Sequence, residues 1–240
     1  MLEDYENALP LYEEAYQLAL EHKSIELQQA SGIMLIKYLC GAGYYSESLE
    51  YYNKINPEIA FNPSIQNEVV KSYMELNKPD SARIYLTARL LSERGDKIVL
   101  NCMMAETYIT EELEDSAFVF LDRAMKSYKE RAKNYQKKGK EPILPNCFLS
   151  PCYSFADLLW KKGKIQQASQ YYMIVEPLMK EMVKTPVRME LQIKALTNFS
   201  SFCRETKQYE KALDLLARRD SVLQTYLEFK VKNDKKNYAE

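Results

Sequence analysis

Apolar and polar positions follow a helical period along the whole chain. A small residue followed four positions later by a bulky one recurs six times, at intervals of 34 to 51 residues. Positions i and i+4 lie one turn apart on the same face of a helix, so each pair predicts a notch beside a large side chain. The small residues are Ala8, Ser48, Ala82, Ala117, Ala168 and Ala212, and their large partners are Tyr12, Tyr52, Leu86, Leu121, Tyr172 and Leu216.

A second helical pattern precedes every notch except the first. Its apolar residues recur at spacings of three and four, as in Leu35, Ile36 and Leu39, and a polar or glycine-containing break separates it from the notch helix. No segment alternates in the manner of a strand. We therefore predict an all-α chain of about eleven helices, in five antiparallel pairs preceded by one unpaired helix at 4–20. Ser46, Asp80 and Asp115 are the expected helix caps.

The phrases "DYENAL" (4–9) and "QYEKAL" (208–213) carry a tyrosine three residues before the notch alanine, and "GYYSESL" (43–49) repeats the phrase with Ser48. These residues resemble the tetratricopeptide repeat (TPR) family. The resemblance implies a right-handed superhelical solenoid of antiparallel helix pairs. Departures from the family pattern are the large Ile36 and Val70 at a small first-helix position, and Arg89 and Arg219 in place of alanine.

The two ends of the chain suggest its domain organisation. A second helix without its first cannot bury its apolar face, so we expect 4–20 to belong to an upstream pair, with a natural N-terminal cap as the alternative. We assign 1–222 to the repeat domain and 223–240 to a helical extension. The extension's apolar residues recur at coiled-coil-like intervals that begin within the last repeat: Leu216, Leu223, Leu227, Val231 and Tyr238.

The terminal segment "RRDSVLQTYLEFKVKNDKKNYAE" (218–240) is similar to the end of the TPR sensor region of bacterial membrane-bound histidine kinases and related transcriptional regulators. This resemblance implies a ligand- or partner-sensing role outside the inner membrane, in the periplasm. The alternative is a cytosolic adaptor or assembly scaffold that binds peptide segments of partner proteins, which the five cysteines without a disulfide pattern favour. Both alternatives are binding functions without catalysis.

The apolar stripe of 223–240 also predicts an oligomeric state. In the intact protein we expect a homodimer through a short parallel coiled coil of these residues. The alternative, favoured for this chain alone, is that the first part of the stripe folds back as a cap of the solenoid.

Composition excludes several function classes. Lys and Arg total 33 against 34 for Asp and Glu, so no net charge attracts nucleic acid or an anionic membrane. The longest nearly apolar run, 32–45, is shorter than the roughly 20 residues of a membrane span. His22 is the only histidine and follows a helix, where an exposed capping role is expected. We predict no catalytic residues, no cofactor and no metal.

Two local features keep alternatives open. Cys147 and Cys152 are close enough to pair or to bind a metal, although their spacing is not that of a zinc site. The segment 123–145 carries eight basic and two acidic residues, which indicates either a patch for phosphate or an acidic partner or, as the favoured interpretation, the solvated face of a long helix. With only Tyr128 and Tyr135 available for stacking, single-stranded nucleic acid is not expected.

The TPR resemblance also implies a ligand-binding concave groove lined by the first helix of each pair. Partners would be proteins or peptides, or a small ligand. Lys37, Asn67 and Lys71 form part of the cluster with which such grooves hold a peptide carboxylate, whereas Glu106 and Asp157 would oppose it. For Trp160, core packing and groove exposure are equally expected. The full set is Lys37, Asn67, Lys71, Met74, Cys102, Glu106, Tyr153, Asp157, Trp160, Thr197 and Arg204.

Overall fold

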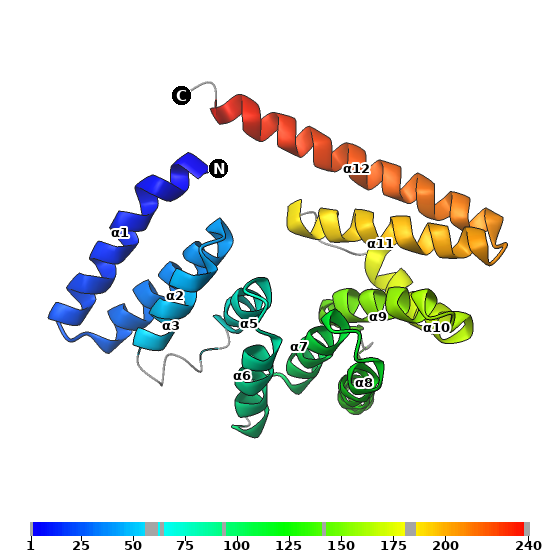
Figure 1. Ribbon diagram of the computed structural model, residues 1–240, viewed down its shortest axis with the longest axis horizontal. Helices are drawn as coiled ribbons and strands as arrows, with labels where there is room; N and C mark the ends of the chain where they lie inside the picture. The colour runs from blue at the N-terminus through cyan, green and yellow to red at the C-terminus, as the bar shows by residue number, and fades with distance from the viewer. Residues whose placement is uncertain are drawn as a thin grey trace. The chain divides into compact units, whose positions relative to one another are not determined.

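The computed structural model describes residues 2–55, 62, 65–92, 95–140, 143–180 and 186–237, and every regular element in these ranges is a helix. Eleven α-helices and one 3-10 turn are described (Figure 1). The chain divides into two compact units, 1–108 and 109–240. The prediction of an all-α chain built from consecutive antiparallel helices is confirmed.

The first unit holds six helices: α1 (Leu2–Glu21), α2 (Ile25–Ala42), α3 (Tyr45–Lys54), α5 (Gln66–Glu75), α6 (Pro79–Leu91) and α7 (Lys97–Thr110, through Tyr108). Leu35, Ile36 and Leu39 of α2 are fully buried against Tyr16 of α1 and Ile55 at the end of α3. The large Ile36 thus occupies a position where the repeat pattern expects a small residue.

The second unit begins with α8 (Glu114–Lys137) and the 3-10 turn η2 (Asn146–Phe148). Two helix pairs follow: α9 (Leu149–Lys161) with α10 (Ile165–Lys180), and α11 (Pro186–Glu205) with α12 (Tyr209–Asn237). An aromatic cluster joins the two pairs, since the rings of Tyr172 and Phe199 are stacked with centroids 4.6 Å apart and Phe202 lies 4.9 Å from Tyr172.

The first helix of each pair ends in the same turn. A residue with positive φ lies two positions before the next helix begins and five positions before the notch residue. After α2, Gly43 and Tyr44 donate backbone hydrogen bonds to Cys40 and Leu39 at 3.3 and 2.9 Å, which is the Schellman ending of a helix. The positive-φ residues of these five turns are Gly43, Asn77, Glu112, Gly163 and Lys207.

Five of the six notch residues occupy the buried positions predicted for them, whereas Ala8 of α1 is half-buried. Ser48, Ala82, Ala117 and Ala168 are fully buried, and Ala212 is nearly so. Each of these five notch residues follows the positive-φ residue of its turn by five positions. The five repeats therefore share one register, although the number of residues between successive notches varies from 34 to 51.

The predicted helix caps are wrong. Ser46, Asp80 and Asp115 are each the second residue of their helix, and no side-chain cap hydrogen bond forms at the N-cap residues Tyr44, Lys78 and Leu113. The left-handed turn begins the next helix directly, so these side chains lie inside the first turn. His22 is exposed after α1, as expected.

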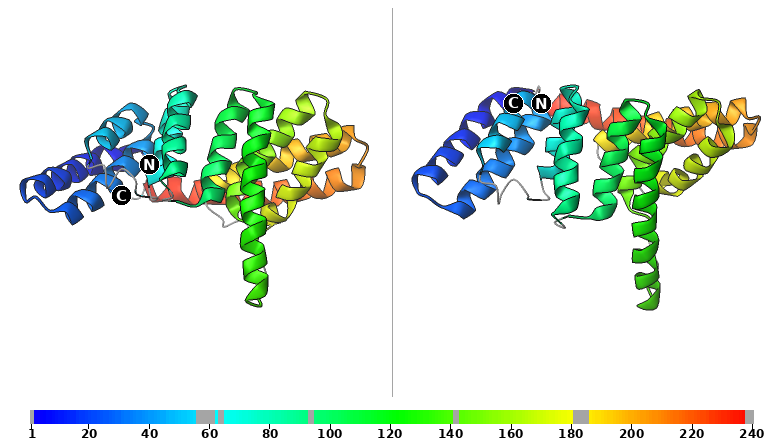
Figure 2. Two further views of the ribbon diagram at one scale, coloured as in Figure 1. Left: turned by 90° about the horizontal axis from the view of Figure 1, so that it is seen from below. Right: turned by 60° about the horizontal axis from the view of Figure 1, so that its bottom comes forward.

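Two helices of the second unit are unusually long. In both panels of Figure 2, α8 (green) continues beyond the other helices of its unit. Helix α12 runs unbroken through the predicted boundary at 222/223 and ends at Asn237, so that boundary stays a prediction. Tyr238 lies outside the described residues. In the described part of the chain, no helix has the length and apolar character needed to cross a membrane.

Candidate binding site

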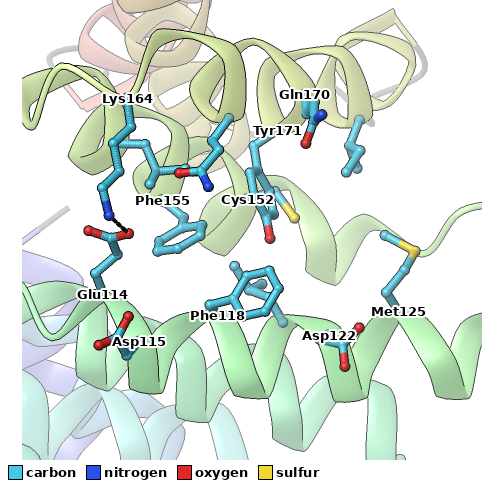
Figure 3. A pocket seen from close by; sticks show the side chains of 14 residues that line it. Glu114, Asp115, Phe118, Asp122, Met125, Cys152, Phe155, Lys164, Gln170 and Tyr171 are labelled. Atoms are coloured by element: carbon cyan, nitrogen blue, oxygen red, sulfur yellow. Dashed lines mark hydrogen bonds and ion pairs between the residues drawn. The ribbon is translucent and has the colours of Figure 1, made fainter.

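A pocket of about 390 Å³ lies between α8, α9 and α10 of the second unit (Figure 3). Its floor is apolar: Leu121 of α8 and Cys152, Phe155 and Leu159 of α9 are each no more than 2% exposed. The floor residues recur at spacings of three and four on α9, so the face that builds the core also builds the base of the pocket.

The walls of the pocket are apolar and aromatic. Phe118 of α8 is 52% exposed, although its helix neighbour Leu121 is buried. Tyr171 of α10 packs edge-on against Phe155, with ring centroids 4.9 Å apart. Burial raises the pKa of Tyr171, and the nearby Cys152 and Asp122 raise it further, so at neutral pH the phenol is a neutral hydrogen-bonding group.

The rim of the pocket is polar. At one end, Glu114 forms an ion pair with Lys164, and Lys162 lies 3.7 Å from the same carboxylate. Asp122 of α8 is paired with Lys126 at 2.6 Å and lines the pocket below Tyr171, as Figure 3 shows.

Three exposed side chains complete the rim: Gln167 and Gln170 of α10 and Asp115 of α8. The side-chain amides of Gln167 and Gln170 can both donate to and accept from a peptide backbone.

This arrangement suits the binding of an apolar group. Ligand pockets are typically a few hundred Å³ in volume, with mostly apolar walls and a few polar groups that fix orientation. The floor of this pocket offers dispersion contacts and the rim offers hydrogen bonds. In the described residues, no three His, Cys, Asp or Glu side chains are grouped so that they could hold a metal ion.

The predicted groove residues of the first unit lie on three helices. Lys37 on α2 is half-buried, whereas Asn67 and Lys71 on α5 are exposed and lie one turn apart. The Cys40 thiol donates to the backbone oxygen of Glu68 at 3.6 Å, which packs α2 and α5 together within a turn of these three residues. Lys71 lies over the ring of Tyr45, 5.5 Å from its centroid, so its charge is directed toward α3.

The other predicted residues of this unit are less accessible. Met74 and Glu106 are half-buried, and Cys102 is only 2% exposed. Lys37, Asn67 and Lys71 thus form the accessible part of the predicted set on this unit. The predicted groove spans both units, so as a single site it stays a prediction.

In the second unit, the structure joins predicted groove residues in a hydrogen-bond network. Asn198 of α11 donates to Asp157 at 2.5 Å and to the Tyr153 hydroxyl at 2.9 Å, both on α9. Tyr172 of α10 donates to the other carboxylate oxygen of Asp157. Burial and the Asp157 carboxylate raise the pKa values of both tyrosines, which keeps them protonated donors.

This network binds helices to one another, which changes the interpretation of its members. Tyr153 is only 2% exposed, and Asp157 is half-buried with both oxygens occupied. Trp160 is half-buried: its indole packs edge-on against Phe202 at 5.8 Å and donates to Glu205 at 3.0 Å. Its ring thus takes part in core packing, and its exposure in a groove stays a prediction.

The remaining predicted residues differ in their surroundings. Arg204 is exposed near the end of α11, and the half-buried Thr197 donates its hydroxyl to the backbone oxygen of Ile193 at 2.8 Å. None of the five cysteines forms a disulfide, so Cys147 and Cys152 are not bonded to each other in that way. Cys152 lies on the pocket floor, whereas Cys147 is half-exposed.

Sequence reasoning did not find the pocket. The spacing of Phe155 and Leu159 predicts only a core-facing side of a helix, and the two sides of the rim are 50 residues apart at the Glu114–Lys164 pair. Phe118 directly follows the notch alanine of α8, at the position that Leu9, Leu49 and Leu213 occupy in the repeat phrases, so its residue type gave no signal of a pocket.

Comparisons with known proteins identify the fold. No family model matches the chain, and no curated protein has a significantly similar sequence. Among solved structures, the TPR-like repeats of a kinesin light chain protein from Podospora anserina match 82% of this chain and 96% of their own length, with 14% identity and a TM-score of 0.52. A Q17M variant of that protein matches 84% and 97%, with 14% identity and a TM-score of 0.54. The chain therefore has a TPR-like all-α solenoid fold.

Proposed function

We propose that this chain is a non-catalytic protein-interaction module that binds a segment of a partner protein in the pocket between α8, α9 and α10. The observation that carries the proposal is the partly exposed Phe118 at the wall of a pocket with a buried apolar floor. An exposed aromatic residue beside a concave apolar surface is typical of a binding anchor.

The chemistry of the pocket indicates what the segment offers. The floor takes one apolar side chain, because Leu121, Phe155 and Leu159 present only carbon to it. The rim amides of Gln167 and Gln170 suit the backbone of an extended peptide. A small apolar ligand of similar volume is the alternative occupant.

Selection from a displayed random peptide library, followed by fluorescence anisotropy with the selected peptides, tests the proposal. We expect the peptides to share an apolar residue. Phe118→Ala should weaken their binding at least about tenfold, because truncating an anchor at an interface removes about 2 kcal/mol or more. Val119→Ala is the matched control, because Val119 is an exposed neighbour on the same helix outside the pocket lining, and it should leave affinity within about twofold.

The proposal fails if no peptide is enriched, or if the two variants bind the selected peptides equally well. A selected set without any shared apolar residue would also contradict it.

The biological setting distinguishes two roles for such a module. A cytosolic adaptor or scaffold needs only the pocket. The sensor region of a bacterial signalling protein also needs a route for its output, and the C-terminal part of α12 suits that role because Leu227 and Val231 are about half exposed, one turn apart. The periplasmic location, the small ligand and the coiled-coil homodimer through 223–240 all belong to this second hypothesis and stay predictions.

Light scattering separates these roles on the chain itself and on a version extended beyond Glu240. The sensor hypothesis predicts that the extended chain dimerises and that Leu227→Asp with Val231→Asp makes it monomeric. An extended chain that stays monomeric at high micromolar concentration would leave only the adaptor role.

A further inference from the structure

A row of lysines that neither the fold nor the pocket uses runs along the C-terminal part of α8 and ends at Lys140, three residues beyond the helix. Lys129, Lys133, Lys137 and Lys140 are spaced by four, four and three residues, and all four are exposed. The first three lie on one face of the helix, one turn apart. We call these four residues the lysine stripe.

The stripe points away from the packed face of α8. Ala117, Leu121 and Ala124 are buried, and Tyr128 on the same face packs edge-on against Phe148 at 6.1 Å. At 100° per residue, Lys133 and Lys137 lie on the opposite side of the helix from these residues, and the exposed Lys129 lies at the edge of that side. The stripe is therefore held outward on a helix whose other face is fixed to the unit.

The part of α8 that carries the stripe extends past its neighbours. Helix α8 has 24 residues, whereas α9 has 13 and α10 has 16, and both panels of Figure 2 show its end beyond the other helices of the unit. All residues from 133 to 140 are exposed. Lysines four residues apart on a helix repel one another, so an anion bound along the stripe relieves a repulsion that the free helix retains.

We propose that the lysine stripe is a docking surface for an acidic segment of a partner protein. Charge complementarity is the reason for choosing an acidic segment as the ligand. The segment 123–140 has eight basic residues and one acidic residue, Glu130, although the net charge of the whole chain is −1. The attraction is therefore local, which suits a short run of Asp or Glu more than a long polyanion that meets the rest of the surface.

Nucleic acid is a poorer occupant. Bases bind by stacking on aromatic rings, and of the two tyrosines in this part of α8, Tyr128 is already engaged with Phe148. Tyr135 is 44% exposed but lies on the other side of the helix from the stripe.

The stripe also continues a face of α8 that lines the pocket. Asp115, Phe118, Asp122 and Lys126 precede Lys129 at steps of three or four, so the charge along this face changes from negative to positive. A segment bound in the pocket could follow α8 onto the stripe, but the stripe does not depend on the pocket for its own binding.

Anisotropy of a fluorescent poly-L-glutamate peptide of about 20 residues tests the docking surface directly. We expect binding at about 50 mM NaCl that weakens at least tenfold at about 300 mM, because exposed charges are screened by salt. The triple variant Lys129→Gln, Lys133→Gln, Lys137→Gln should bind at least about tenfold more weakly than the unmodified chain.

Two controls make the outcome decisive. The variant Lys97→Gln, Lys161→Gln, Lys194→Gln removes the same charge from exposed positions on other helices and should change affinity less than about twofold. Phe118→Ala should also leave poly-L-glutamate binding unchanged, which separates failure of the stripe from failure of the pocket. Equal binding by the two triple variants overturns the proposal, as does tighter binding of duplex DNA or anionic vesicles than of poly-L-glutamate.

Discussion

Replacement of Asp157 by alanine tests whether this residue holds the second unit together. Its carboxylate accepts hydrogen bonds from the fully buried Tyr172 on α10 and from Asn198 on α11. Hydrogen bonds to a charged group contribute about 1.5–3 kcal/mol each, and a buried hydroxyl left without a partner costs about 1–3 kcal/mol. Because Asn198 keeps its bond to Tyr153 and Asp157 is half-buried, we expect a loss of about 2–3 kcal/mol of unfolding free energy.

Urea unfolding followed by tryptophan fluorescence is the appropriate assay. Trp160 is the only tryptophan and packs against Phe202, so its emission reports on the second unit. A double-mutant cycle with Tyr172→Phe isolates the hydrogen bond, because the phenylalanine removes only the hydroxyl. The double variant should be more stable than the sum of the single losses predicts, by about 1 kcal/mol or more.

The control is Asp214→Ala on α12, whose side chain is 64% exposed and which should change stability by no more than about 0.5 kcal/mol. The reasoning is refuted if Asp157→Ala is as mild as this control, or if the coupling with Tyr172 is absent. In either case the Asp157 carboxylate would not be what holds α9, α10 and α11 together.

Three further predictions concern turns, thiols and alkaline pH. Glycine at Glu112 or Lys207, which adopt positive φ, should raise the unfolding free energy by about 0.5–1 kcal/mol in thermal or urea unfolding; a loss would mean that the left-handed turn is unstrained. At pH 8 one thiol should react rapidly with a disulfide reagent, and Cys147→Ala should abolish that phase, because the other four cysteines are buried; a rapid phase in Cys147→Ala would contradict this. Burial and the hydrogen bond to Glu13 raise the pKa of Tyr51 to about 12, so the unfolded chain loses this proton first and stability should fall between about pH 10 and 12; Tyr51→Phe should lessen that fall in alkaline unfolding curves, and an unchanged curve would refute the assignment.

Much of the fold is readable from the sequence because the notch residues and their bulky partners are local. Ala82 and Leu86 are one turn apart in sequence and are both fully buried in the structure. The helix ends are less readable. Gly43, Gly163 and Asn77 mark their left-handed turns by residue type, whereas the charged Glu112 and Lys207 adopt the same backbone without that signal.

The site is less predictable than the fold because it depends on which helices meet. The family resemblance placed Tyr153 and Asp157 at an open groove, but both side chains are engaged by Asn198, a residue more than 40 positions away. The pocket itself combines a core-facing stripe of α9 with exposed residues of α8 and α10. No local pattern distinguishes such a floor from an ordinary core.

Methyl NMR of the chain with a selected peptide tests the central claim most directly. Binding in the pocket predicts shift changes at the methyl groups of Leu121, Met125, Leu159 and Ile174, all of which line it. The methyl resonance of Met74, which lies on α5 in the unit formed by residues 1–108, should not shift. Changes at Met74 with an unperturbed pocket would contradict the account and would place binding on the predicted first-helix surface instead.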